Sequence, residues 1–108
     1  MAALEALERM LAAGKDSPML RFSLANEHLR AGNPASATTH LERAVAQDPD
    51  YSAAWKILGK AREATGDRAG AMAAWQQGIT VATARGDQQA AREMGVFLKR
   101  ASRDVPPD

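Results

Sequence analysis

The chain has 108 residues, a formal net charge of +1 and no cysteine, and this length suits a single domain. The near-neutral charge argues against a strongly basic nucleic-acid-binding face and against a polybasic membrane anchor. The lack of cysteine excludes disulfides, thiolate nucleophiles and thiolate metal sites. No apolar run is long enough for a signal peptide or a membrane span, so we expect a cytoplasmic protein.

Helix-forming residues dominate the composition, with 24 alanines against six valines and isoleucines together. Alanine loses no side-chain entropy in a helix, whereas β-branched residues lose rotamer freedom there. No segment alternates polar and apolar residues in the manner of a strand. The composition therefore predicts an all-α fold.

Capping residues, prolines and glycines mark the ends of the predicted helices. Ser17-Pro18 and Asn33-Pro34 each combine a capping side chain with a proline that suits the first helical position. Short connections require each helix to run antiparallel to the next. The predicted helices cover about residues 2–13, 18–31, 34–47, 52–65, 68–84 and 88–103, and residues 105–108 are expected to form a frayed tail.

The central part of the chain repeats with a period of 34 residues. A shift of that length superimposes identical residues at turns and at helix-contact spacing: Leu24 on Leu58, Gly32 on Gly66, Ala35 on Ala69 and Ala37 on Ala71. A repeat of this length that contains two helices predicts two stacked hairpins, at about residues 18–51 and 52–85.

These features resemble the tetratricopeptide repeat family. Trp55, Leu58 and Gly59 stand at the family's W-x2-L-G spacing, and Ala71 with Trp75 is similar to its A-x3-F element. The departures from the pattern are Arg21 at the tryptophan position, His28 and Arg62 at the tyrosine position, and Thr83 at the closing proline. The resemblance implies a short right-handed solenoid in one domain, residues 1–104.

The flanking helices fit the repeat more loosely. Extending the phase backward places Leu7 on Leu41, so helix 2–13 resembles the second helix of a degenerate leading repeat. Extending it forward places Arg92 and Glu93 at the leucine and glycine positions of a third repeat. Helix 88–103 is therefore expected to be an amphipathic capping helix at the end of the solenoid.

The sequence offers little for catalysis, and we expect a protein that is not an enzyme and uses no cofactor or metal. His28 and His40 lie in different predicted helices, and both are expected to be structural. No metalloprotease, nucleophile-elbow or phosphate-loop motif is present. The cluster Lys99, Arg100 and Arg103 is expected to complement a helix dipole rather than to bind nucleic acid.

The resemblance implies a binding surface, because such proteins bind peptides or partner helices on a concave face lined by the first helix of each hairpin. The residues carried over to this face are Met19, Phe22, Asn26, Leu29, Arg30, Lys56, Ile57, Lys60 and Glu63. This mixture of apolar and basic groups would suit a hydrophobic segment with a negative charge or a C-terminal carboxylate. In the alternative interpretation, neighbouring helices cover Met19, Phe22 and Leu29.

Two other functions are weighed against this one. The carboxylate clamp that reads chaperone tails is unsupported, because Phe22 and Ile57 replace a lysine and an asparagine of that clamp, although Asn26 matches. The remaining alternative is a structural protein that self-associates through an open end of the solenoid, burying the stripe of Leu4, Leu7 and Leu11 or the last helix. We expect a monomer or a weak homo-oligomer with an unidentified protein or peptide partner.

Overall fold

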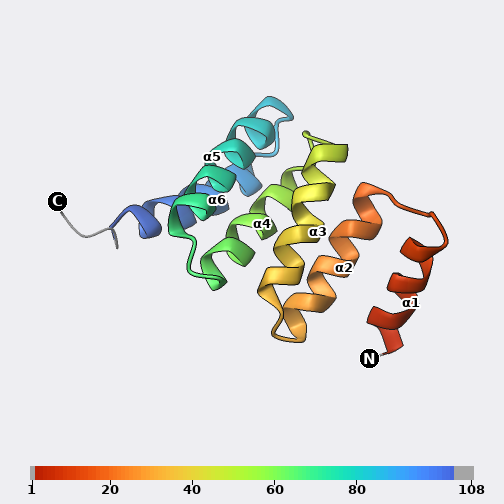
Figure 1. Ribbon diagram of the computed structural model, residues 1–108. Helices are drawn as coiled ribbons and strands as arrows, with labels where there is room; N and C mark the ends of the chain where they lie inside the picture. Colours follow the sequence, from red (N-terminus) through yellow and green to blue (C-terminus); the bar gives the residue numbers. More distant parts are fainter. Residues whose placement is uncertain (1, 104–108) are drawn as a thin grey trace.

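The computed structural model describes residues 2–103, which form six helices and no strand (Figure 1). The helices are α1 (Ala2–Ala12), α2 (Pro18–Arg30), α3 (Pro34–Gln47), α4 (Ser52–Ala64), α5 (Arg68–Ala84) and α6 (Gln88–Arg103). The predicted all-α class is confirmed, and the predicted frayed tail lies outside the described residues. No helix in residues 2–103 is long and apolar enough to cross a membrane.

Three of the predicted capping residues act as the sequence predicts, but Asn33 does not, because its side chain makes no capping hydrogen bond and Pro34 alone marks the start of α3. The hydroxyl of Ser17 accepts a hydrogen bond from the backbone N–H of Leu20 at 3.1 Å, and the carboxylate of Asp67 accepts one from Gly70 at 2.9 Å. Asp87 caps α6 in the same way, accepting from the backbone N–H of Ala90 at 3.1 Å. These side chains satisfy donors that the first helical turn leaves unpaired, and so fix where each helix begins.

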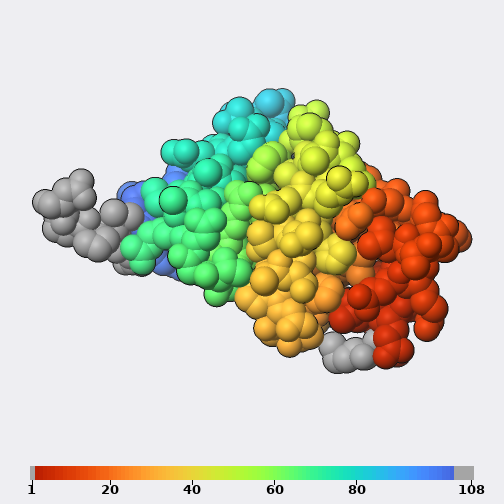
Figure 2. Space-filling model, viewed as in Figure 1, coloured from red at the N-terminus to blue at the C-terminus, as the bar shows by residue number. Residues whose placement is uncertain are grey.

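The helices stack into an elongated row of antiparallel hairpins. The extents are 46 × 30 × 19 Å, and the radius of gyration is 14.2 Å. Each helix packs on its neighbours in the chain, and α4 also packs on α6. The space-filling view shows α1 at one end of the row and α5 with α6 at the other (Figure 2). This arrangement places α2, α4 and α6 as the first helices of successive hairpins.

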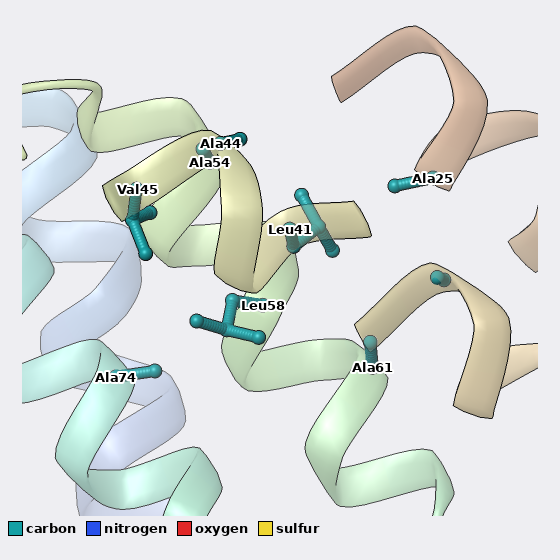
Figure 3. Packing of buried hydrophobic residues seen from close by; sticks show 9 residues of the cluster. Ala25, Leu41, Ala44, Val45, Ala54, Leu58, Ala61 and Ala74 are labelled. Carbon is teal, nitrogen blue, oxygen red and sulfur yellow. The ribbon is translucent and has the colours of Figure 1, made fainter. Parts of the chain in front are cut away.

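The space between hairpins is filled by side chains at equivalent repeat positions. Leu24 and Leu58 have no exposed surface, and Leu58 lies between Val45 of α3 and Ala74 of α5 (Figure 3). The alanines around them leave room for the helices to approach closely. Truncating a buried leucine of this kind typically costs about 2–5 kcal/mol of stability.

Gly59 in the second hairpin lies against Trp75, the largest fully buried side chain among the described residues. A Cβ atom on Gly59 would overlap the indole ring of Trp75, which is 1% exposed. The indole Nε1–H donates a hydrogen bond to the backbone oxygen of Lys56 at 3.1 Å. The glycine therefore lets α5 lie flat against α4.

The register of α6 differs from the expectation. Leu24 stands seven positions after the cap Ser17. Met94 stands seven positions after the cap Asp87, and it has no exposed surface. Gly95 then follows Met94 as Gly59 follows Leu58. The expectation that Arg92 and Glu93 hold these positions was wrong. α5 is three residues longer than α3, and the connection after it (85–87) is one residue shorter than that after α3 (48–51), so the phase shifts by two. α6 thus has the position of a first helix, although no second helix follows it among the described residues.

The two glycines should respond in opposite ways to the same substitution. Gly59→Ala should lower the free energy of unfolding by about 1–3 kcal/mol, because the added methyl group displaces Trp75. Gly95→Ala should raise it by about 0.5–1 kcal/mol, because no atom lies within 4 Å of the added group and alanine favours the helix. Urea unfolding of both variants measures the difference. Destabilisation of equal size at both positions would contradict the assigned packing.

Candidate protein-binding surface

The two histidines, predicted to be structural, lie together between α2 and α3. Their rings stack with centroids 5.3 Å apart, and Nη1 of Arg21 lies 3.1 Å from Nδ1 of His40. Arg21 also donates two hydrogen bonds of 2.8 Å to the carboxylate of Asp16. Arg21 thus occupies the family's tryptophan position and links the connection before α2 to α3.

The electrostatic environment of this pair favours a neutral His40. Burial lowers the pKa of His40 below its ordinary value, and the positive charges of Arg21 and His28 act in the same direction, against Glu8 and Asp16. Hydrogen bonds from Arg21 and Gln47 hold the pKa of Asp16 well below its usual range. Within residues 2–103, no three histidine or carboxylate side chains come together as a metal site.

The predicted binding residues lie on α2 and α4, and we call the surface that α2, α4 and α6 form the first-helix face. Met19 is 71% exposed there. Phe22 is half-buried and packs on Tyr51 with ring centroids 5.2 Å apart. Leu29 and Ile57 are half-buried against the core. Neighbouring helices therefore cover much of Phe22 and Leu29 and leave Met19 open.

The polar residues of the first-helix face engage neighbours within the chain. Arg30 pairs with Glu27 at 2.8 Å, and Lys56 pairs with Glu93 of α6 at 3.5 Å. The ammonium group of Lys60 lies 4.2 Å from the ring centroid of Phe97, also on α6. The remaining predicted residues, Asn26 and Glu63, are half-buried and exposed respectively. The two lysines thus join α4 to α6 at the protein surface.

Two hollows lie where successive first helices meet. One of about 400 Å³ lies at the start of α2 and α4, lined by Ser17, Pro18, Met19, Asp48, Tyr51 and Arg85. A second of about 260 Å³ separates α4 from α6 and is lined by Ser52, Ala53, Lys56, Asp87, Gln89, Ala90 and Glu93. Both are open to solvent and carry apolar and charged groups together.

Sequence reasoning missed the contribution of α6 to this face. In the corrected register, Arg92, Val96 and Lys99 are equivalent to Lys56, Lys60 and Glu63 of α4. Counting from the cap Asp87 instead of extending the 34-residue phase would have found them. Tyr51 and Arg85 were also missed, because they lie outside the repeat positions that the resemblance identifies. Arg85 donates a hydrogen bond of 2.8 Å to the backbone oxygen of Asp50.

Comparison with known proteins gives the family. Residues 22–91 match the family model described as tetratricopeptide repeat. The chain belongs to the tetratricopeptide repeat family. This tetratricopeptide repeat chain is 54% identical over 100 residues to the TPR repeat-containing protein PA0015 of Pseudomonas aeruginosa, covering 93% of this chain and 95% of that protein.

Other relatives extend the comparison. The solution structure of protein BPP2914 from Bordetella parapertussis matches with a TM-score of 0.82 at 46% identity, covering 96% of this chain and 90% of that one. A segment of 80 residues is 33% identical to the beta-barrel assembly-enhancing protease of Escherichia coli, covering 72% of this chain and 16% of the protease. Tetratricopeptide repeats commonly act as protein–protein interaction modules and are generally non-catalytic.

The half-buried His40 should make stability depend on pH. Because the folded pKa of His40 lies below the ordinary value of 6.5, its contribution is present above pH 6.5 and is lost as the pH falls through the folded pKa. The Tm should therefore fall between about pH 7.5 and about pH 5.5, above the range in which most carboxylates titrate.

The matched variants separate this effect from other titrations. His40→Gln should flatten the decline in Tm, whereas Arg100→Gln on the exposed surface of α6 should leave it unchanged. Thermal unfolding followed by circular dichroism measures all three proteins. If wild type and His40→Gln lost equal amounts of Tm, His40 would not be the group responsible.

Proposed function

We propose that this protein binds a peptide or helix of a partner protein on the first-helix face and performs no catalysis of its own. The observation that carries the proposal is the exposed side chain of Met19 beside the hollow of about 400 Å³. An exposed, flexible apolar side chain next to a hollow lined by Tyr51 and Arg85 provides both an apolar anchor and an orienting charge.

The charges of the first-helix face favour a ligand with acidic groups. Lys60 is exposed on α4, and Arg92 and Lys99 are exposed on α6 at the positions equivalent to Lys56 and Glu63. The contacts of Lys56 with Glu93 and of Lys60 with Phe97 do not block a ligand, because exposed ion pairs and cation–π contacts are each worth only about 0–1 kcal/mol. We infer a segment whose apolar side chains reach Met19 and whose carboxylates reach these cations.

Two synthetic peptides with the same apolar residues, one carrying glutamates and the other lysines, test this proposal. The glutamate peptide should shift the amide resonances of Met19 and of residues 53–64 in ¹⁵N NMR spectra, whereas the lysine peptide should not. Shifts confined to α3 and α5, or equal responses to both peptides, would contradict the proposed surface.

A charge reversal checks the role of the cations. Lys60→Glu should weaken binding of the glutamate peptide by about three- to tenfold, because it replaces attraction by repulsion at an exposed position. Arg43→Glu makes the same change of net charge on α3 and should alter the affinity little. Isothermal titration calorimetry measures both variants. Equal weakening by the two substitutions would mean that only net charge matters and would argue against a defined site.

A further inference from the structure

The exposed large hydrophobic side chains within residues 2–103 lie at the two ends of the helix row. Met10 on α1 is 44% exposed and Met19 on α2 is 71% exposed, whereas Val96 on α6 is 52% exposed at the other end. Large apolar side chains gathered at the ends of a repeat protein indicate surfaces where a further repeat would pack.

At the α6 end, the surface on which a following second helix would pack is open. Trp75 of α5 packs on Gly59, but no atom lies within 4 Å of a Cβ built on Gly95. Ala91 stands where α4 has Trp55, and beside it lies a hollow of about 270 Å³ lined by Thr83, Gln88, Ala91 and Arg92. Among the described residues, α6 therefore packs on the preceding helices α4 and α5, and no following second helix packs on it.

At the α1 end, the place that a first helix would fill is open. A cleft of about 190 Å³ between α1 and α2 is lined by Leu7, Met10, Lys15, Ser17, Met19, Leu20 and Ser23. On α6, the equivalents of Met19, Leu20 and Ser23 are Gln89, Ala90 and Glu93, which line the junction with α4. The cleft therefore corresponds to the position of a first helix lying next to α2. α1, which contains no buried residue, would be its second helix.

We propose that α6 of one molecule enters the α1–α2 cleft of a second copy, so that α6 and the second copy's α1 complete one hairpin. Gly95 then faces α1 of the second copy as Gly59 faces α5. Val96 of one copy, with Met10 and Met19 of the next, becomes covered in the same contact. The inference rests on the open ends of the helix row. It shares Met19 with the proposed binding surface, so a ligand held at Met19 would compete with this contact.

The charges favour this pairing over a symmetric one. α6 carries four basic side chains and one acidic side chain, whereas α1 carries two acidic and one basic. Two copies of α6 would repel each other, whereas α6 and α1 attract. A dimer joined through two different surfaces still has one free surface of each kind, so the assembly grows beyond the dimer as the concentration rises.

Sedimentation velocity of the 108-residue chain tests the contact, over about 10 µM to about 1 mM because a small interface of this kind is weak. The wild-type sedimentation coefficient should rise with concentration. Gly95→Arg blocks the α6 surface at a position with open space around it, and Met10→Arg blocks the cleft at an exposed position. Each variant alone should remain a monomer. Ala73→Arg, on the exposed surface of α5, should associate like wild type.

An equimolar mixture of the two blocked variants gives the decisive result. The free α6 of Met10→Arg should enter the free cleft of Gly95→Arg, so the mixture should form dimers and nothing larger. Circular dichroism of each variant verifies that the helices are intact. A wild-type monomer at every concentration, association of Gly95→Arg alone, or a mixture that stays monomeric would each overturn the proposal.

Discussion

The arrangement of this protein depends on a large side chain of each second helix packing against a small residue of the preceding first helix. In the second hairpin Trp75 lies on Gly59, and its indole nitrogen is satisfied by the backbone oxygen of Lys56. The close approach fixes the distance and the angle between α4 and α5. Because the hairpins then stack through Leu24, Leu58 and similar buried side chains, α2, α4 and α6 come to lie on one surface.

The same packing leaves that surface open for the ligand that we propose. Side chains of the first helices that face the second helices are buried in the core. The first helices therefore keep exposed side chains only on the surface that points away from the second helices. Lys56 and Lys60 of α4 lie partly over α6 through Glu93 and Phe97. These exposed contacts are weak, so exchanging them for contacts with the proposed ligand would cost little. The proposed binding therefore requires no backbone movement.

The helices and the repeat could be predicted because their signals are local: capping side chains, glycines and a 34-residue period. The register of α6 could not be predicted from that period, because the longer α5, together with the shorter connection after it, leaves the apolar spacing intact while moving the phase by two residues. The stacking of His28 on His40 was missed for a different reason, since it depends on how α2 and α3 rotate against each other in the hairpin. On the candidate surface, the sequence identified Met19 and Lys60 but not Tyr51 or Arg85, which reach it from outside the first helices.

The open ends follow from how repeat proteins gain stability. A single hairpin cannot bury its own apolar surface, so stability comes from stacking each unit on the next, and end surfaces are normally polar. Here the otherwise polar outer surface of α6 is interrupted by Gly95 and the exposed Val96, and α1 leaves Met10 uncovered. The described residues contain two complete hairpins, α2–α3 and α4–α5. They lie between two unpaired helices: α1, which has the position of a second helix, and α6, which has the position of a first helix. Joining α6 of one copy to α1 of another would add a complete hairpin at each contact and leave every internal helix of the assembly with both of its neighbours.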